Sequence, residues 1–247
     1  MPDLPYFEMP LVTLLAFFVK GATGFGTALI MIPISTILVG VHLAIVASSI
    51  LDTVAGGILF SHNPLPHCRR YWIPMAGGMV VGSVGGGIVL SFVPVEGFKL
   101  FLGIVIVFLG LWFLAGRGGK DESSLPSNPP ELASWGDIAV STFSGFCGGL
   151  FGISGPPIVY YLGKRLAKRA FRSILVAVFL FGGIARLTTY TFTGILTFEA
   201  ILLSIVSLPG LLVGLYLGNH LFVRIKEVWF SRFIGVILIL SAVRLLI

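Results

Sequence analysis

Eight apolar stretches divide this chain, and polar, glycine-containing or proline-containing segments separate them. Most have the length of about 17–25 residues that a helix needs to cross a bilayer. The first and fifth stretches are interrupted by glycines, whereas the unbroken ones predict single helices. No barrel-type alternation of apolar and polar residues occurs, so the pattern predicts an all-α fold. The stretches cover residues 9–38, 42–62, 73–94, 98–115, 136–162, 173–194, 199–218 and 229–247.

The composition predicts that these helices lie in a membrane. Of 247 residues, 56% are apolar and 11% are charged, and the mean hydropathy is +1.04, which is more apolar surface than a soluble core can bury. The net charge of +6 is scattered among loops, so we expect contact with lipid and no nucleic-acid partner. Cys68 and Cys147 form no framework, and the histidines lack metal-ligand spacing, so no disulfide, metal or cofactor is expected.

The chain contains two copies of one unit, because glycines and phenylalanines of the first half recur 132 positions later. A linker rich in glycine, serine, proline and charge, residues 116–135, separates a first membrane repeat at 1–115 from a second at 136–247. Duplicated units with paired broken segments are typical of secondary transporters. The matching pairs are Gly78 and Gly210, Gly82 and Gly214, Gly86 and Gly218, Phe98 and Phe230, Phe101 and Phe233, and Gly103 and Gly235.

The loop charges favour inverted repeats. If the two broken stretches enter the membrane and return on the same side, the loop Lys and Arg residues divide 12 against 1, with Lys99 as the exception. If all stretches cross, the division is 9 against 4. Positive loop residues concentrate on the cytoplasmic side, so we predict an inverted pair of repeats, each with a re-entrant broken segment and three transmembrane helices. The linker would then be cytoplasmic and both termini outside. Eight full crossings with parallel repeats are the alternative.

The two broken stretches carry the residues expected to bind a substrate. Ser154 is expected to cap a half-helix whose first turn accommodates Pro156, and Thr23 or Thr27 would play the same role in the first break. A helix N-terminus offers free N–H donors and partial positive charge, so two facing half-helix N-termini at the midplane would bind an anion. Glycines let a substrate approach the backbone, although close helix packing also selects them. The candidates are Thr23, Gly24, Gly26, Gly152, Ser154 and Gly155.

Three charged residues lie deep inside apolar stretches. A charge at the bilayer centre costs on the order of 3 kcal/mol, so it is expected to face protein or water. Lys20, beside the first break, and Arg186 could each bind an anionic substrate. Alternatively, Lys20 could snorkel to the interface, and Arg186 could pair with a carboxylate. Asp52, the only acid well inside a stretch, could carry a coupling proton or neutralise either cation.

The glycine motifs resemble those of a known family. The segment from Gly21 to Gly26, followed by Pro33, and the segment from Gly149 to Pro157 resemble the sulfite exporter TauE/SafE family, also described as toluene sulfonate uptake permeases. The resemblance covers essentially the whole chain, including the central linker. It implies secondary transport of small sulfur-containing anions, such as sulfite or organosulfonates, across a bacterial plasma membrane, with protons as a coupling partner. The first motif has fewer glycines than the family pattern, because Phe25 and Thr27 interrupt it.

Two other functions would use the same residues. A passive anion channel would line a pore with the break residues and the cations. Asp52 discriminates a channel from a carrier, because only a carrier would use it for uphill, pH-driven uptake. An intramembrane serine protease would use Ser154, in the sequence Gly-Ile-Ser-Gly, with His220 as its base. A protease gives no reason for duplication of the whole chain, so we expect a transporter and not an enzyme.

Overall fold

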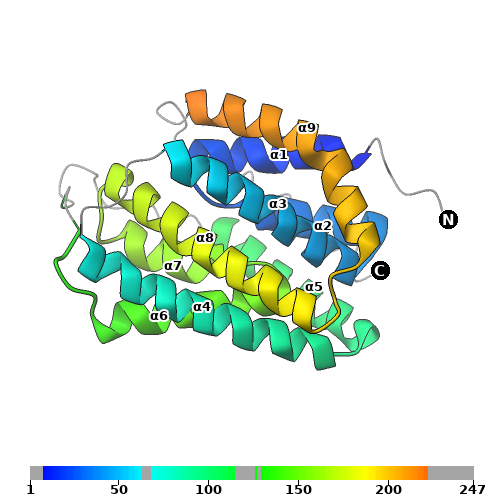
Figure 1. The fold of residues 1–247 in the computed structure, drawn as a ribbon, viewed down its shortest axis with the longest axis horizontal. Helices are drawn as coiled ribbons and strands as arrows, with labels where there is room; N and C mark the ends of the chain where they lie inside the picture. Colours follow the sequence, from blue (N-terminus) through cyan, green and yellow to red (C-terminus); the bar gives the residue numbers. More distant parts are fainter. Residues whose placement is uncertain (1–7, 63–67, 115–125, 127–128, 222–247) are drawn as a thin grey trace. The chain divides into compact units, whose positions relative to one another are not determined.

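The structure is a computed structural model, and it describes residues 8–62, 68–114, 126 and 129–221. All regular secondary structure in these ranges is helical, in agreement with the expected all-α class. The last apolar stretch, 229–247, lies outside the described residues, together with the predicted repeat positions Phe230, Phe233 and Gly235. The helices are α1 (Glu8–Thr23), α2 (Thr27–Val39), α3 (Val41–His62), α4 (Arg69–Phe92), α5 (Val95–Leu114), α6 (Trp135–Phe151), α7 (Gly155–Gly163), α8 (Lys168–Phe192) and α9 (Phe198–Leu221) (Figure 1).

Helix lengths separate the broken stretches from the spanning ones. Among the described residues, α3, α4, α8 and α9 are long and apolar enough to cross a membrane. The first stretch forms α1 and α2, of 16 and 13 residues, and the fifth forms α6 and α7, of 17 and 9 residues. Each of these four helices is shorter than the roughly 20 residues that span the hydrocarbon core. Both glycine-containing breaks are therefore confirmed as interruptions of helices.

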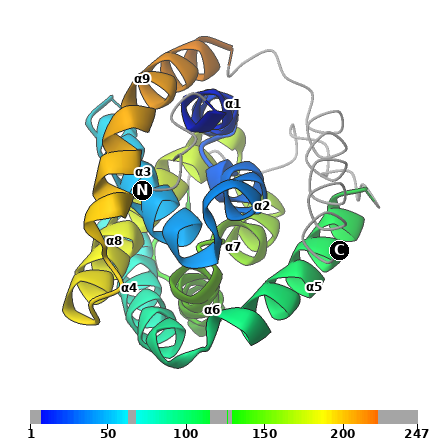
Figure 2. The ribbon, with the colours of Figure 1, turned by 90° about the vertical axis from the view of Figure 1, so that its right-hand side faces the viewer.

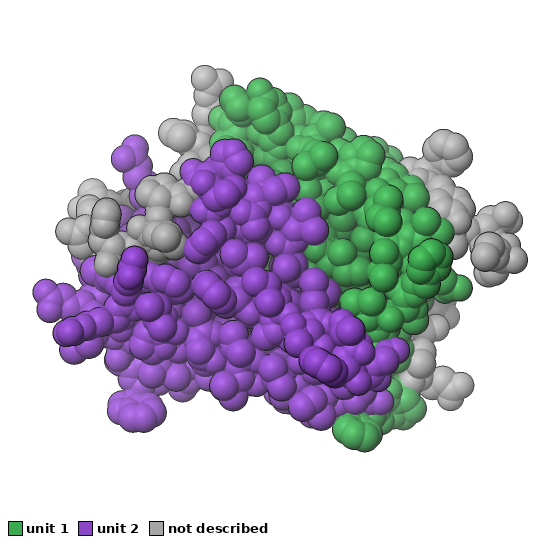
Figure 3. Space-filling model, viewed as in Figure 1, with its two compact units in different colours: residues 1–51, 92–118, 195–247 green, residues 52–91, 119–194 purple. Residues whose placement is uncertain are grey.

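The chain forms two compact units, and each draws helices from both halves of the sequence (Figure 3). Unit 1 comprises residues 1–51, 92–118 and 195–247, and thus α1, α2, the first half of α3, α5 and α9. Unit 2 comprises residues 52–91 and 119–194, and thus the second half of α3, nearly all of α4, and α6, α7 and α8. The predicted repeats describe how the sequence is duplicated, whereas the units describe how the helices pack.

In unit 1, a row of glycines brings α9 against α1, and the two helices lie side by side (Figure 1, Figure 2). A Cβ placed on Gly214 would lie 2.9 Å from the backbone nitrogen of Phe18, and one on Gly218 would lie 2.9 Å from that of Ala22. Only glycine permits so close an approach of two backbones. Because successive glycines of α9 meet successive turns of α1, the two helices run parallel.

Unit 2 repeats this arrangement with α4 and α6. A Cβ on Gly82 would lie 2.7 Å from the nitrogen of Phe146, and one on Gly86 would lie 2.8 Å from that of Leu150. Gly149 of α6 makes the reciprocal contact, because its Cβ would lie 2.6 Å from the nitrogen of Gly87. The duplicated glycines are therefore helix-contact positions. In both units, a helix from one repeat packs on the broken segment of the other.

The α6–α7 segment, residues 135–163, returns to the end of unit 2 at which it begins. A Cβ on Gly136, at the start of α6, would lie 2.9 Å from the hydroxyl of Tyr161, near the end of α7. The guanidinium of Arg165, just beyond α7, lies 3.6 Å from the carboxylate of Asp137. The segment is thus a helical hairpin, which we call the α6–α7 hairpin.

We predict that Gly82→Ala and Gly214→Ala destabilise the protein by about 1–3 kcal/mol each, because the added methyl group meets backbone atoms that cannot rotate away. Thermal unfolding of the purified protein in detergent measures the effect. Gly77→Ala is the matched control on α4, since nothing in the described structure lies within 4 Å of its Cβ position. Equal unfolding temperatures for Gly77→Ala and Gly82→Ala would contradict this account of the helix contact.

Candidate functional site

The second break begins where α6 ends at Phe151. Gly152 is the C-cap, with φ of 74°, and its N–H donates to the carbonyl of Gly148 at 2.9 Å. Such a left-handed conformation favours glycine and stops the helix. Ser154 is the N-cap of α7, as predicted, but its side chain makes no capping hydrogen bond. Its carbonyl instead accepts a hydrogen bond from the hydroxyl of Ser144, which ties the break to the body of α6.

The N-terminus of α7 is a weaker donor of hydrogen bonds than the sequence analysis assumed. Pro156 and Pro157 occupy its first turn, and neither has an N–H. Of the first four positions, only Ser154 and Gly155 retain one. The positive end of the helix dipole remains, but a bound anion would need donors from elsewhere.

Arg186, from α8, supplies donors at this break. Its side chain is 4% exposed, and its NH1 donates to the carbonyls of Gly148 at 3.1 Å and Gly152 at 3.4 Å. Its NH2 lies 3.7 Å from Oδ2 of Asp52, in α3. A cation at the C-terminal carbonyls of α6 is favourable, because these carbonyls form the negative end of the helix dipole. In the described part of the chain, Nε of Arg186 is buried and has no hydrogen-bond partner.

Gly148 lies between Arg186 and Ser154. A Cβ placed on Gly148 would lie 3.4 Å from NH1 of Arg186, 3.4 Å from Oγ of Ser154 and only 2.7 Å from Cβ of Ser154. A larger residue would therefore occupy the space between the guanidinium and the hydroxyl. The structure thus brings together four residues that the sequence analysis selected separately: Gly152, Ser154, Arg186 and Asp52.

A second side chain of α8 also holds the end of α6. The buried hydroxyl of Tyr190 donates to the carbonyl of Gly149 at 2.6 Å. The carbonyls in the last turn of α6 have no helical partners, and within a membrane they need other donors. Arg186 and Tyr190 meet this need, so α8 positions the break.

The first break, in unit 1, differs in detail. Lys20 is 2% exposed and lies in the last turn of α1, and its carbonyl accepts the N–H of Gly24 at 2.7 Å. Its buried position argues against simple snorkelling to the interface. Gly24 and Gly26 have φ of 86° and 95°, so both positions favour glycine for conformational reasons.

The predicted capping of α2 by Thr23 or Thr27 is wrong. The N-cap of α2 is Gly26, and Thr27 is already the first helical residue. The hydroxyl of Thr23 is engaged within the turn, where it donates to the carbonyl of Val19 at 2.9 Å or of Phe25 at 2.8 Å. It also accepts the N–H of Phe25 at 3.3 Å. Local hydrogen bonds of this kind compete with capping. That the N-termini of α2 and α7 face each other stays a prediction.

Sequence reasoning missed Asp137, a second buried acid. It is 2% exposed, and its carboxylate accepts hydrogen bonds from the backbone N–H of Ser134 at 2.7 Å and from the hydroxyl of Tyr71 at 3.1 Å. The signal was present, because Ser134-Trp135-Gly136-Asp137 has the spacing of a capping box at the start of an apolar stretch.

A groove of about 610 Å³ lies between α4 and α6 in unit 2. Its lining residues include Val81, Trp135 and Phe143 and carry no charge. These three side chains are exposed, as expected for a surface that faces lipid. The groove offers nothing to bind an anion, so the break remains the candidate site. No cluster of three or more His, Cys, Asp or Glu side chains that could hold a metal occurs among the described residues.

Comparison with family models adds an independent observation. The model of the sulfite exporter TauE/SafE family matches residues 9–245, which is nearly the whole chain. The chain belongs to this family. Comparisons with curated proteins and with solved structures found no match. Membership in TauE/SafE, together with the long apolar helices, makes this a multi-pass membrane protein of a transporter family. The break residues therefore lie in a TauE/SafE protein whose family name refers to a sulfur oxyanion.

The Asp52–Arg186 pair leads to a prediction about stability in this TauE/SafE protein. Arg186→Gln should destabilise it by about 3–5 kcal/mol, because it breaks a largely buried ion pair and takes this cation away from Asp52. The double variant with Asp52→Asn should recover part of this loss. Thermal unfolding of the two single variants and the double variant forms a double-mutant cycle. Strictly additive losses would show that the two charges do not interact.

Proposed function

We propose that this chain is a secondary transporter that moves a small sulfur-containing anion, such as sulfite or an organosulfonate, together with protons. The observation that supports it best is the buried guanidinium of Arg186 at the α6–α7 break. Its Nε has no hydrogen-bond partner within the described structure, and its NH1 and the hydroxyl of Ser154 both lie 3.4 Å from the Cβ position of Gly148. A buried cation with a spare donor suits an oxyanion, and family membership supports a sulfur anion.

In this proposal Arg186 and Ser154 bind the oxygens of the anion, and Gly152 and Gly155 keep the backbone accessible. Glycines at 152 and 155 leave no side chain between the anion and the N–H groups of the break. Lys20, Thr23, Gly24 and Gly26 form the corresponding part of the first break. Lys20 supplies the positive charge there, since it is buried in the last turn of α1.

Asp52 gives a physical route to proton coupling. While its carboxylate is ionised, it neutralises Arg186 across 3.7 Å and competes with a bound anion for the guanidinium. Protonation of Asp52 removes this competitor and favours anion binding. Proton and anion would then bind cooperatively, because binding couplings are reciprocal. If both are carried in one step, they move across the membrane in the same direction.

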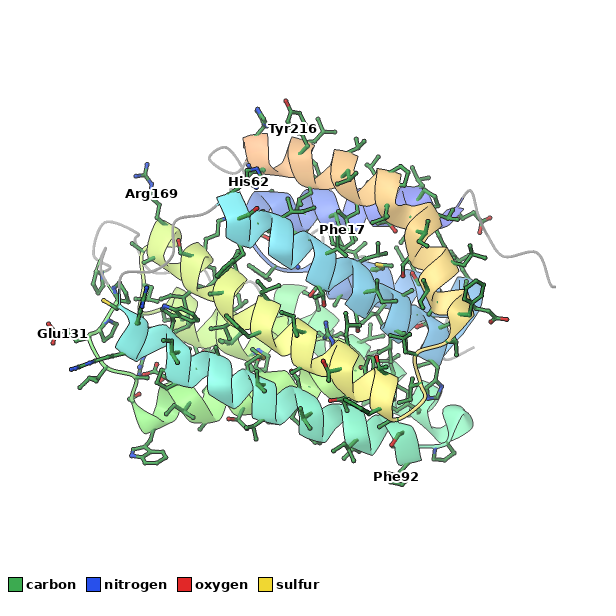
Figure 4. The ribbon with its side chains drawn as sticks, viewed as in Figure 1. Phe17, His62, Phe92, Glu131, Arg169 and Tyr216 are labelled. Carbon is green, nitrogen blue, oxygen red and sulfur yellow. The ribbon has the colours of Figure 1, made fainter. Side chains whose placement is uncertain are left out.

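The arrangement in the membrane is also part of the proposal. The α6–α7 hairpin returns to its starting end, so it does not count as a crossing. Along the chain from α4 to α9, we therefore count α4, α5, α8 and α9 as the successive crossings. Under this count, α4 is the first crossing and α9 the fourth, so the two helices run in opposite directions. Because α6 runs parallel to α4 and α1 runs parallel to α9, α6 and α1 also run in opposite directions. This supports inverted repeats. Basic residues lie at the hairpin end of unit 2, and Figure 4 shows Arg169 toward the same end of the unit as Glu131 of the linker. We assign this end to the cytoplasm.

The transport prediction is tested with purified protein in liposomes. Wild-type protein should accumulate sulfite or a small organosulfonate against its gradient when the outside is acidified. Asp52→Asn should abolish the pH-driven accumulation, and Ser154→Ala should weaken binding of the anion. Glu131→Gln, which removes an exposed acid in the linker, is the matched control and should transport normally.

Other outcomes of this assay would contradict particular parts of the proposal. Unchanged uphill uptake by Asp52→Asn would remove Asp52 from proton coupling. Downhill movement without any response to the pH gradient would favour a channel. No movement of either anion would exclude both as substrates.

The orientation is tested with single cysteines in a variant whose Cys68 and Cys147 are replaced by serine. We expect Glu131→Cys to react with a membrane-impermeant maleimide only after the cells are opened, and Glu199→Cys, at the start of α9, to react in intact cells. Both glutamates are exposed, so access to the reagent is limited by the membrane alone. Labelling of Glu131→Cys from outside would contradict a cytoplasmic linker.

A further inference from the structure

A cluster of polar side chains lies at the base of the α6–α7 hairpin, at the opposite end of α7 from the break. At its centre is Asp137, with a side chain that is 3% exposed. Oδ2 accepts the N–H of Ser134 at 2.7 Å and its hydroxyl at 2.6 Å. Oδ1 accepts the hydroxyl of Tyr71 at 3.1 Å and lies 3.6 Å from NH1 of Arg165. The donors come from the start of α4, the start of α6 and the turn after α7.

Among the described residues, only the ion pair with Arg165 connects the side chain of Asp137 to the returning arm of the hairpin. Ser134 belongs to the capping box of α6 itself, and Tyr71 belongs to α4, which packs along α6. Arg165 follows α7 by two residues, and its guanidinium lies 4.2 Å from the ring centre of Tyr161. The ion pair between Asp137 and Arg165 therefore links the two ends of the hairpin directly.

The two partners differ in how much the fold depends on them. Removing the carboxylate of Asp137 would leave buried donors without an acceptor, which is strongly destabilising. The side chain of Arg165 is 52% exposed, and half-exposed ion pairs contribute little to stability. Without Arg165, the donors from Ser134 and Tyr71 would still satisfy the carboxylate. The link between the ends of the hairpin can thus be cut without unfolding the protein.

We infer that Asp137 and Arg165 form a clasp, and that both are positioning residues for the anion site at the break. The functional half of this inference rests on the proposed transport activity. With only 9 residues, α7 is a short rod of about 14 Å between the clasp and Ser154. A displacement at its base therefore moves Ser154 relative to Arg186, which is held independently by α8. Closing the clasp sets the geometry in which the anion binds.

The test uses Arg165→Gln, with Lys164→Gln as its matched control. Lys164 is the adjacent exposed cation and also lies over a tyrosine ring, 3.7 Å from the centre of Tyr160, so the control makes the same change in charge. In the liposome assay, Arg165→Gln should raise the KM for sulfite by about fivefold at most, because a half-exposed ion pair contributes little energy, while kcat and the unfolding temperature change little. Lys164→Gln should behave as wild type.

A distance measurement separates the clasp from the transport proposal. Spin labels are placed at Leu132→Cys, three residues before the hairpin, and at Gly163→Cys, its last residue, in a variant with Cys68 and Cys147 replaced by serine. Both positions are exposed, and the distance between the labels in liposomes measures how far apart the two ends of the hairpin lie. We expect one narrow distance distribution in the protein with Arg165, the same distribution with Lys164→Gln, and a broader, longer one with Arg165→Gln.

The outcomes are distinct. An unchanged distribution in Arg165→Gln would overturn the clasp, whatever the transport assay shows. A broadened distribution with an unchanged KM would overturn the positioning role. Absence of transport of both sulfite and an organosulfonate by wild-type protein would reject the proposed function, and the spin-label distances would still decide whether the clasp exists.

Discussion

The structure depends on the direct approach of helix backbones along two rows of glycines. Inside a bilayer the hydrophobic effect does not drive helices together, so association relies on close packing and hydrogen bonds. Glycines of α9 permit contact with α1, and glycines of α4 permit contact with α6. Each broken segment thereby packs against a helix from the other half of the chain. This explains why the two compact units do not coincide with the two sequence repeats.

The break in unit 2 shows how the same groups serve stability and function. Interrupting a helix within the membrane leaves carbonyls without partners, and α8 provides donors for them through Arg186 and Tyr190. The cation that satisfies these carbonyls is held beside Ser154 and close to Asp52. A buried charge that would be costly in isolation is therefore supported by the negative end of α6 and by an acid. In the described structure, Nε of Arg186 nevertheless has no hydrogen-bond partner.

Particular residues show which predictions succeed from sequence. Ser154 was correctly expected at the N-cap of α7, because a serine before two prolines is a local signal. Thr23 fails as a cap because its hydroxyl makes hydrogen bonds within the turn, and the two candidates could not be ranked without the backbone dihedrals. Arg172 lies one residue before the predicted stretch 173–194, yet it is buried within α8. Asp137 was overlooked because it lies at the start of an apolar stretch, where its burial depends on Tyr71 and Arg165, which are distant in sequence.

The sequence by itself determined the helical class, the membrane environment, the positions of both breaks and the glycine rows. These properties follow from the length of apolar stretches and from the backbone preferences of glycine and proline, which act over a few residues. Only the tertiary structure decided that α4 packs on α6 and α9 on α1, that Arg186 meets Asp52 and the end of α6, and that Arg165 reaches back to Asp137. Such pairings depend on contacts between residues 28 to 200 positions apart, and the pattern of apolar residues along one helix does not specify its neighbour.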